Sequence, residues 1–236
     1  MSRALLAILL CAGCRARPPA PILTWHSIAK GGDGFTVSPE QFAAQLDALK
    51  DRPTLSLHQL LDGPPPPRAV VLTFDDGAES SFSVALPELR KRNLRGTFFI
   101  VTGLVGDDEA HRRVEGGVRY LVWPEVVALA RAGMEIGSHS VDHARLADLP
   151  AERIREELVE SKRALEQHLG TPVEFFAYPF NAVRSPVRAA IIAAGYRGAV
   201  AGEVHGSDDL FGLYRVSIQR GTTLADLRAA LSRWPP

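Results

Sequence analysis

The sequence predicts a single α/β domain with a barrel-like sheet, and two observations indicate it. Short apolar runs alternate with segments of helical periodicity along nearly the whole chain, which is typical of a parallel sheet joined by helices. Several of these runs end in aspartates or histidines, and the carboxyl ends of parallel strands are where such sheets carry their chemistry. The 236 residues, 46% of them hydrophobic, are enough for one domain with a substantial core.

The charge balance argues against one class of partner. The formal net charge is zero and the pI is about 7.1, so the sequence offers no positively charged field for nucleic acid, and we expect no nucleic-acid partner. No apolar run reaches the ~18–20 residues that span a bilayer.

The first fourteen residues have the composition of an export signal. Arg3 precedes an apolar stretch at 4–10, and Cys11-Ala12-Gly13-Cys14 follows it. The small residues before Cys14 resemble the lipobox of bacterial lipoproteins, which implies that Cys14 is lipidated and begins the mature chain. Cys11 stands where that motif usually has leucine, and a plain secretory signal or an uncleaved anchor are the alternatives.

This interpretation divides the chain into three parts. Residues 1–14 are the signal segment, residues 15–21 form a tether rich in proline and arginine, and residues 22–236 form the domain. We therefore expect an exported cell-envelope lipoprotein, on the periplasmic side or at the cell surface, or otherwise a secreted protein. A lipid anchor would be its only attachment to the membrane.

The elements of the first half follow from local signals. The apolar run 21–25 is predicted to be the first strand, and it ends at His26. A serine cap at position 38, followed by proline and a glutamine at position 41, predicts a helix from there to about residue 50. After four prolines, the run 69–74 is predicted to be a strand buried on both faces, and a helix over 82–93 follows it.

The second half repeats the alternation. Segment 103–117 is polar and contains glycines, so we expect an exposed loop there. Strands are predicted at 96–101, 134–137, 173–177, 197–201 and 214–218, and helices at 123–131, 150–169, 186–194 and 223–232.

Two adjacent carboxylates follow the strand predicted at 69–74. They are Asp75 and Asp76, and Gly77 comes next. Because successive side chains of a strand point to opposite faces, both carboxylates reach one site only if the chain leaves the strand there. Gly77 supplies the backbone freedom for that turn. A polar exit from a strand into a loop would use the same residues, so other groups must decide between the two interpretations.

Two histidines four residues apart supply such groups. His139 and His143 follow another predicted strand. Two imidazoles and the carboxylate of Asp76 form a donor set that suits a divalent cation with open positions for water and substrate. We expect Ser140 and Asp142 to orient the imidazoles.

Three segments together resemble the motifs of the polysaccharide deacetylase family, the NodB-homology carbohydrate esterases. They are 73–77 (Thr-Phe-Asp-Asp-Gly), 138–143 (Ser-His-Ser-Val-Asp-His) and 176–180 (Phe-Ala-Tyr-Pro-Phe). They occur in the family's order and at its usual separations, and the likeness covers about residues 21–220. It implies a distorted (β/α) barrel and metal-dependent removal of N-acetyl groups from amino-sugar polymers.

The same resemblance implies a role for each residue. Asp75 is the general base, while Asp76, His139 and His143 hold the metal. The metal is commonly Zn²⁺, with Ni²⁺ or Co²⁺ as alternatives. The backbone N–H of Phe180 binds the developing oxyanion.

The general acid comes from a more specific likeness. The family usually supplies it from a late Leu-x-x-His-type motif, which segment 213–220 lacks. Residues 22–26 (Ile-Leu-Thr-Trp-His) resemble the circularly permuted branch, the biofilm poly-N-acetylglucosamine deacetylases, whose histidine motif lies near the amino terminus. This likeness makes His26 the acid that protonates the leaving amine. The alternative is a strand-end histidine with a structural hydrogen bond.

Two positions depart from the family pattern. Ala177 stands where many members have an arginine that orients the catalytic aspartate, although the permuted branch shares this form. We therefore expect the ionisation of Asp75 to depend mainly on the charge of the metal. Asn181 stands where glycine is usual, and asparagine tolerates a positive φ.

The leading functional hypothesis is deacetylation of a polymer of N-acetylglucosamine. An exopolysaccharide is the first candidate, with peptidoglycan and chitin as alternatives, and Tyr178 and Trp25 are candidates to stack on sugar rings. Core packing is the alternative for the tryptophan. The competing hypothesis is a catalytically inactive carbohydrate-binding or scaffold protein of the same fold, because the usual arginine is missing. A separate glycan-binding protein would help if the polymer must be held over many sugars.

Overall fold

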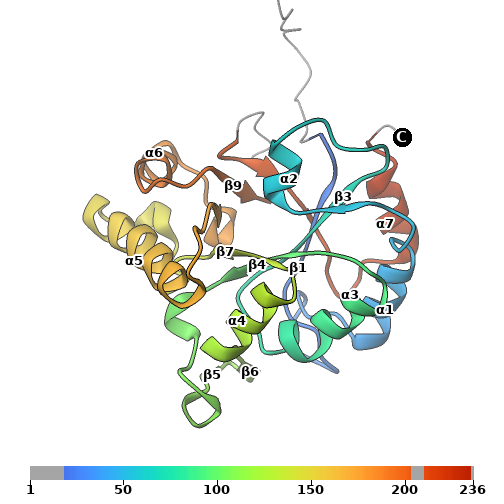
Figure 1. Ribbon diagram of the computed structural model, residues 1–236, viewed down its shortest axis with the longest axis horizontal. Helices are drawn as coiled ribbons and strands as arrows, with labels where there is room; N and C mark the ends of the chain where they lie inside the picture. Colours follow the sequence, from blue (N-terminus) through green and yellow to red (C-terminus); the bar gives the residue numbers. More distant parts are fainter. Residues whose placement is uncertain (1–18, 203–209, 235–236) are drawn as a thin grey trace, which may run out of the picture.

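The computed structural model describes residues 19–202 and 210–234. Within them a nearly closed parallel sheet is surrounded by helices, which confirms the predicted barrel-like α/β domain (Figure 1). The predicted signal segment with Cys14, and the predicted tether as far as residue 18, lie outside the described residues. None of the helices in the described part of the chain is long and apolar enough to cross a membrane.

Nine strands of the described residues form the main sheet. They are β1 (Ile22–Trp25), β2 (Thr54–Leu55), β3 (Val70–Phe74), β4 (Thr97–Ile100), β7 (Glu135–Ser138), β8 (Phe175–Ala177), β9 (Gly198–Ala201), β10 (Leu213–Tyr214) and β11 (Val216–Ser217). Their order is β10-β9-β8-β7-β4-β3-β1-β11, with β2 paired to β3. Each of these pairings is parallel, so the carboxyl ends of the strands meet at one mouth of the barrel.

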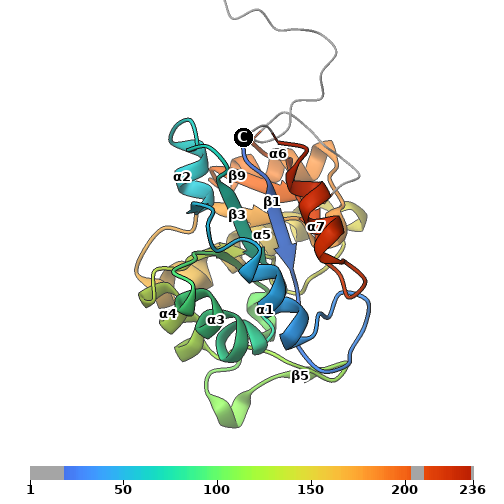
Figure 2. The same ribbon diagram turned by 90° about the vertical axis from the view of Figure 1, so that its right-hand side faces the viewer.

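Helices cover the outside of the sheet. They are α1 (Pro39–Asp47), α2 (Leu57–Leu61), α3 (Leu86–Lys91) with a π-helical turn before it (Ser81–Ala85), α4 (Trp123–Arg131), α5 (Ala151–Leu169), α6 (Ser185–Ala193) and α7 (Leu224–Leu231). Short 3₁₀ turns lie at Thr102–Leu104, Glu109–His111, Leu146–Asp148 and Pro179–Asn181. Figure 2 shows α1 and α7 side by side next to β1.

Local signals account for the helix starts. The hydroxyl of Ser38 accepts a hydrogen bond from the backbone N–H of Gln41 at the start of α1, as predicted. The hydroxyl of Thr223 does the same for Asp226 at the start of α7. The predicted helices and strands are thereby confirmed to within a few residues at their ends.

The sequence prediction lacks two small features of the fold. One is the pair β2 and α2, although a capping box between Ser56 and Gln59 marks the start of α2. The other is an antiparallel hairpin of β5 (Val114–Glu115) and β6 (Val118–Arg119), which lies in the segment predicted to be an exposed loop and protrudes at the bottom of Figure 1.

The barrel closes at Arg215. The predicted strand at 214–218 is in fact two short strands, because β10 pairs with β9 and β11 pairs with β1 on the other edge of the sheet. Arg215 is the single residue between them, and it is buried. The chain itself therefore joins the two edges that hydrogen bonds leave open.

Alternation along the strands separates an outer core from an inner one. Trp25, Phe74 and Phe98 face the helices, and their rings pack at centroid distances of 5.7 and 4.6 Å. The inner cluster includes Val71, and the side chains two and four positions further along this strand point to the same side. These are Thr73 and Asp75, so the strand directs Asp75 into the barrel.

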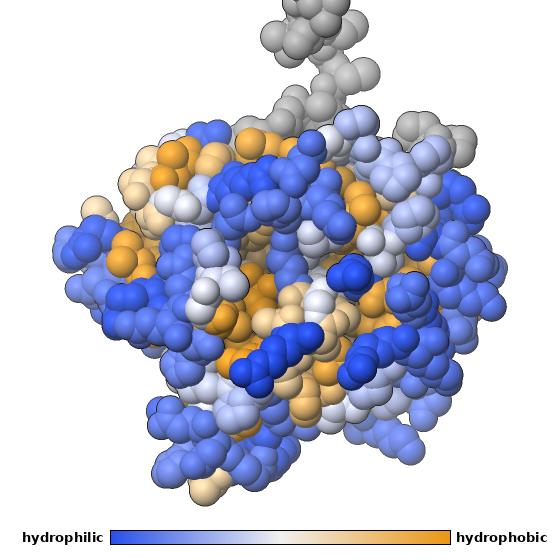
Figure 3. Space-filling view, in the orientation of Figure 1, coloured by the Kyte–Doolittle hydropathy of each residue, from blue (hydrophilic) through white to orange (hydrophobic). Residues whose placement is uncertain are grey.

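The surface shows a matching division. In the orientation of Figure 1, hydrophilic residues cover most of the rim, while apolar residues gather in the hollow at the centre and over α6 at the upper left (Figure 3). The domain also begins slightly earlier than predicted. Ala20 is buried in the inner cluster and the carbonyl of Pro21 accepts a hydrogen bond from Val71, so the last two residues of the predicted tether belong to the domain.

We predict that Gly137→Ala destabilises the domain by about 1–3 kcal/mol. A Cβ atom at this position of β7 would lie 2.4 Å from the ring of Phe99 and 3.1 Å from the carbonyl oxygen of Phe175. Both the ring, which lies in the packed interior of the barrel, and the neighbouring strand would have to shift, and moving closely packed groups costs free energy. Urea unfolding of the two proteins measures the effect.

Gly63→Ala is the matched control for this substitution. Its Cβ atom would have no neighbour within 4 Å, and the backbone has no positive φ there, so we expect a change within about 0.5 kcal/mol. Equal stability of the two variants would contradict the packing that we describe for the barrel interior.

Candidate active site

The carboxyl ends of the strands open into a cavity of about 330 Å³. Hairpin β5–β6 borders it through Val118, and Tyr120 follows directly after the hairpin. The predicted catalytic and metal-binding residues are all among those that line this cavity: Asp75, Asp76, His139, His143, His26 and Phe180.

The chain turns sharply as it leaves β3. Asp76 has φ 70° and Gly77 has φ 77°, so two successive residues adopt the left-handed conformation. Without this turn, Asp76 would point to the opposite side of the sheet from Asp75. The expected exit from the strand is confirmed, and it brings both carboxylates to one cavity.

Asp76, His139 and His143 form a compact group of metal-ligand type. One potential ligand atom from each lies within 4.8 Å of the others. The Oδ1 atom of Asp76 is 3.4 Å from Nε2 of His139 and 3.5 Å from Nε2 of His143. Two imidazoles and one carboxylate on one side of a cavity leave further coordination positions open, so the donor set fits a divalent cation.

The residues that orient this group differ from the expected ones. The Nδ1 atom of His139 lies 2.8 Å from the carbonyl oxygen of Ala177, which leaves Nε2 directed at Asp76. Ser140 instead accepts a hydrogen bond from the backbone N–H of His143, and the carboxylate of Asp142 lies near Arg153. The expectation that Ser140 and Asp142 hold the imidazoles themselves was therefore wrong.

Glu157 fixes the loop that carries both histidines. It is buried on α5, and one of its oxygens accepts hydrogen bonds from the backbone N–H groups of Val141 and Asp142, both at 2.9 Å. The carbonyl of Ser140 also accepts a hydrogen bond from Thr102. These contacts hold a segment in which Ser140 and His143 both have positive φ values.

Arg215 makes a bidentate ion pair with Asp75. Its Nη1 and Nη2 atoms lie 2.7 and 2.6 Å from the two carboxylate oxygens, and both side chains are buried. Nη1 is also 3.2 Å from the hydroxyls of Thr24 and Thr73. The expectation that Asp75 has no arginine partner was therefore wrong: position 177 is alanine, but an arginine reaches the carboxylate from the barrel seam.

These charges shift the pKa values of the site. Burial opposes the ionisation of Asp75, but the charges of Arg215 and His139 and the hydrogen bonds of Arg215 outweigh it, so its pKa is lowered. Burial likewise opposes ionisation of Asp76, and the hydrogen bond and charge of His139 overcome it, so this pKa also falls. Both carboxylates are therefore ionised at neutral pH.

The two histidines shift in opposite directions. Burial lowers the pKa of His139. Its hydrogen bond to Asp76 and the charges of both carboxylates have the larger effect, so the pKa of His139 is raised overall. Burial and the charge of His139 lower the pKa of His143. A cation and protons would therefore compete for these imidazoles, as they do at other histidine sites.

His26 follows β1 directly and faces the same cavity. Its ring packs against the ring of Phe35 at a centroid distance of 4.9 Å. Its Nδ1 atom is buried and has no hydrogen-bond partner in the described part of the protein. The alternative interpretation of His26 requires a structural hydrogen bond, and Nδ1 makes none with the described residues.

Phe180 and Asn181 form a left-handed turn after β8. Their φ values are 56° and 53°, which confirms that Asn181 tolerates the conformation expected of glycine. The side chain of Phe180 is 57% exposed, and its ring packs against His143 at 4.7 Å. Phe180 lines the cavity, as the role that the resemblance implies for it requires.

The aromatic residues predicted to stack on sugar are buried. Trp25 is fully buried, it does not line the cavity, and its indole N–H donates to Gln45. The core-packing alternative for Trp25 therefore holds. Tyr178 lines the cavity but is only 1% exposed, and its hydroxyl donates to the carbonyl of Phe211, so its ring face is not open for stacking.

Sequence reasoning missed several residues of the site. Glu157 and Arg215 carry no motif that points to Asp75 or to the histidine loop, because the fold alone brings them there. Phe35, which is 45% exposed, and Tyr120 also line the cavity. The sequence carries no signal for either residue, because single exposed aromatic residues are common on protein surfaces.

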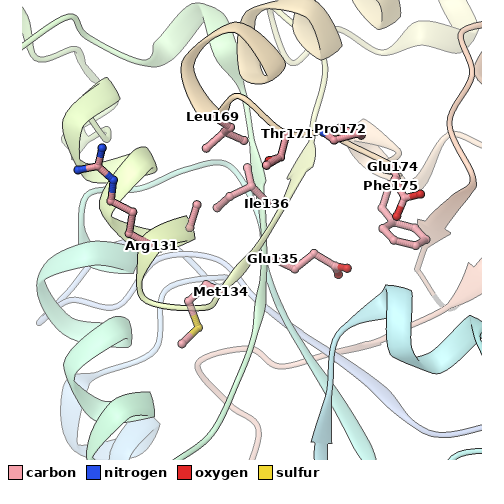
Figure 4. Close-up of a pocket in the computed structure, with 10 residues that line it drawn as sticks. Arg131, Met134, Glu135, Ile136, Leu169, Thr171, Pro172, Glu174 and Phe175 are labelled. Atoms are coloured by element: carbon pink, nitrogen blue, oxygen red, sulfur yellow. The ribbon is translucent and has the colours of Figure 1, made fainter.

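A second cavity lies at the opposite ends of β7 and β8. It has a volume of about 360 Å³, and Figure 4 shows Glu135, Ile136, Glu174 and Phe175 lining it. Glu135 accepts hydrogen bonds from Thr97 and from the first N–H groups of α2, so its carboxylate is already engaged. This cavity brings together no set of catalytic or metal-binding type among the described residues.

The family is decided by a match over more than half of the chain. Residues 62–199 match the family model described as polysaccharide deacetylase. The chain belongs to the polysaccharide deacetylase family. The expected family, its fold and its enzyme class are thereby confirmed.

Individual relatives agree with this assignment. YxkH of Bacillus subtilis, whose name assigns it provisionally to the polysaccharide deacetylases, is 26% identical over 211 residues, which are 85% of this chain and 72% of that protein. The poly-β-1,6-N-acetyl-D-glucosamine N-deacetylase of Staphylococcus aureus is 26% identical over 188 residues, 73% of this chain and 63% of that protein. The present chain thus spans less than two thirds of the staphylococcal enzyme.

A solved structure is similar over most of the chain. A polysaccharide deacetylase from Bacillus cereus superposes with a TM-score of 0.78 and 26% identity, covering 90% of this chain and 68% of that one. The deacetylase barrel therefore accounts for nearly all of the described residues.

We predict that Arg215→Met lowers the stability of the chelator-treated protein by about 3–5 kcal/mol at pH 7, because it leaves a buried carboxylate without a partner. The pKa of Asp75 in the parent lies below the ~3.9 of an unfolded chain. Its ionised form therefore stabilises the parent fully above that value, and this contribution is lost as the pH falls through the folded pKa. In the variant burial raises the pKa of Asp75, so the deficit is largest at neutral pH and shrinks below about pH 4. Urea unfolding over this pH range measures it.

Arg197→Met is the control, since it removes an arginine that pairs with Asp62 at the surface. We expect it to cost less than about 1 kcal/mol. A deficit in Arg215→Met that is equally small, or that grows in acid, would contradict the described pairing.

Proposed function

We propose that this protein is a metal-dependent hydrolase that removes N-acetyl groups from a polysaccharide of N-acetylglucosamine. The observation that carries the proposal is the convergence of Asp75, Asp76, His139, His143 and His26 on one cavity of a deacetylase barrel. The substrate class is supported by the relative that is named a poly-β-1,6-N-acetyl-D-glucosamine N-deacetylase. An exopolysaccharide of this kind is our first candidate, and peptidoglycan and chitin are the alternatives.

Asp76, His139 and His143 would hold the metal, with Zn²⁺ as the first candidate and Ni²⁺ or Co²⁺ as alternatives. The fit rests on the donor set and on His139, whose Nδ1 is engaged by the carbonyl of Ala177 so that Nε2 remains for a cation. A divalent cation bound there would polarise the acetamide carbonyl and lower the pKa of water.

Asp75 is the proposed general base. It is ionised, lies beside the metal-binding group, and is held by Arg215, with its Oδ2 atom 4.0 Å from Nε2 of His139. An ionised carboxylate fixed in this way accepts a proton from the water that attacks the acetamide. Its pairing with Arg215 keeps it in position and opposes its movement toward the cation.

Two further groups complete the proposed reaction. The backbone N–H of Phe180 donates to the oxygen that becomes negatively charged as the water adds to the carbonyl. The imidazole of His26 donates a proton to the nitrogen as the C–N bond breaks, so that acetate and a free amine leave. The exposed rings of Phe35 and Phe180 would contact the apolar faces of the sugars.

The competing hypothesis of an inactive carbohydrate-binding protein is no longer supported by a missing arginine. It was based on the missing arginine at position 177, and Arg215 occupies the corresponding role toward Asp75. A phosphoesterase is disfavoured as well. Arg215 is committed to Asp75, and the described residues that line the cavity offer no cluster of free cations for a phosphate.

We further propose that the protein is exported and anchored to the cell envelope through lipidated Cys14. The support is the sequence alone: a basic residue at position 3, a short apolar core and small residues before the cysteine. A separate glycan-binding partner protein would assist if the polymer must be held over many sugars.

We predict that Asp75→Asn and His26→Ala each reduce acetate release from poly-β-1,6-N-acetylglucosamine oligomers by roughly 10²–10⁴-fold. Neither change removes a proposed metal ligand, so the zinc content per chain should stay at the parent's value. In contrast, His143→Ala should lower the zinc content as well as the rate. Acetate release and metal content measured on the same samples separate the two effects.

His111→Ala is the control, because this histidine is exposed and lies outside the cavity. It should release acetate at the parent's rate. Undiminished release by Asp75→Asn, or by the parent after complete removal of metal, would contradict the proposed mechanism. Glycan binding by the parent without acetate release from any of the three polymers would favour the inactive binding protein.

A further inference from the structure

A cavity of about 550 Å³ lies at the amino-terminal end of the barrel. It is formed where the chain enters β1, around Pro19 and Pro21, by the proline-rich loop 65–67 and by Trp234 near the end of the described chain. In Figures 1 and 2 this end lies at the top, whereas hairpin β5–β6, which borders the active site, lies at the bottom. The cavity is therefore separate from the catalytic one.

Two unpaired arginines line this cavity. Among the described residues that line it, Arg52 and Arg68 are the only charged ones. Neither makes an ion pair within the described part of the chain, unlike Arg92, Arg112 and Arg197. The Nη1 atom of Arg52 donates to the carbonyl oxygen of Arg68 at 3.1 Å, which brings the two residues together. Burial and the charge of Arg68 lower the pKa of Arg52, although a guanidinium keeps its proton under any ordinary condition. Two adjacent positive charges without a protein anion are suited to an external one.

The length of the tether limits where this face can be. If Cys14 carries the lipid, only residues 15–18 separate it from Pro19, and five Cα–Cα steps span at most roughly 18 Å. Two of the four intervening residues, Arg15 and Arg17, are also basic. The end of the barrel that carries Arg52 and Arg68 must therefore lie close to the bilayer surface, and the mouth of the active site lies at the opposite end.

We infer that the amino-terminal end of the barrel docks on an anionic phospholipid surface, with Arg52 and Arg68 contacting lipid phosphates. This inference rests on the lipid anchor proposed above, but not on the deacetylase reaction. Docking would hold the domain in one orientation instead of leaving it free to rotate on its tether. The active site would then face away from the membrane, toward polymer outside it.

The orientation can be measured by energy transfer on the full processed chain. Cys14 is consumed by lipidation and Cys11 is removed with the signal, so a cysteine introduced at Gly63 or Glu115 is the only thiol for a dye. Position 63 lies on the loop that leads to the arginine face, and position 115 lies on the exposed hairpin beside the active site. Each protein is reconstituted on vesicles with a headgroup-labelled acceptor. The vesicles are either phosphatidylcholine alone or phosphatidylcholine containing phosphatidylglycerol.

We expect transfer from position 63 to exceed transfer from position 115 on the anionic vesicles, and the difference to fall at high salt. An arginine near an anionic surface changes such an equilibrium about five-fold. Arg52→Gln/Arg68→Gln should therefore lower the docking equilibrium about 25-fold, while acetate release from soluble oligomers stays at the parent's value. Arg113→Gln/Arg184→Gln is the matched control, since it removes the same charge at the other end of the barrel, and it should dock like the parent.

Three results would overturn the inference. Equal transfer from both positions, a difference that is as large on phosphatidylcholine alone as on the anionic vesicles, or equal loss in both double variants would each show that these arginines do not dock the domain. Failure of the anchor itself is distinguishable, because the dye would then also label Cys11 or Cys14 and Cys14→Ser would behave like the parent. Failure of the deacetylase proposal would appear only in acetate release.

Discussion

The arrangement of this active site depends on a buried ion pair between Arg215 and Asp75. Arg215 lies at the seam where the chain passes from one open edge of the sheet to the other, between β10 and β11. Asp75 lies at the end of β3, and β1 lies between β3 and β11 in the sheet. The pair thus links barrel closure to the position of a reactive carboxylate. A buried arginine without this partner would be very costly, so fold and site depend on each other.

The pair also gives two neighbouring carboxylates different roles. Asp75 is directed into the barrel by strand alternation and bonded to Arg215, whereas Asp76 reaches the same cavity through a left-handed turn and faces the two histidines. Adjacent carboxylates in one cavity would ordinarily repel each other and raise one pKa. Here a guanidinium stabilises one of them and imidazoles stabilise the other, so both pKa values are lowered.

Much of this fold and part of this site could be predicted from the sequence, for physical reasons. Apolar periodicity and helix caps are local, so the strand at β3, the helix beginning at Ser38 and the turn after Asp75 were predicted correctly. Asp76, His139 and His143 are carried by short motifs that directly follow strands, and these three residues do converge. Arg215, Glu157 and the carbonyl of Ala177 are contributed by segments distant in sequence. No local pattern reveals them, because only barrel closure and helix packing bring them to the site.

The error about Asp75 has the same origin. The alanine at position 177 indicates only that no arginine side chain comes from that position, and it carries no information about an arginine from a distant segment. In the structure a guanidinium reaches Asp75 from Arg215, between β10 and β11, and position 177 contributes its backbone oxygen to His139 instead. Likewise Trp25 alternates toward the helices, so its place one residue before His26 puts it in the core and away from the sugar.

The central claim is that Asp76 and the two histidines bind the cation while Asp75 stays on Arg215. A crystal of the zinc-loaded protein, with anomalous scattering recorded at the zinc edge, tests it directly. We predict one strong peak bonded to an oxygen of Asp76 and to Nε2 of His139 and His143, with both oxygens of Asp75 still paired with Arg215. A peak with Asp75 among its ligands, or a peak only at other residues, would contradict the account.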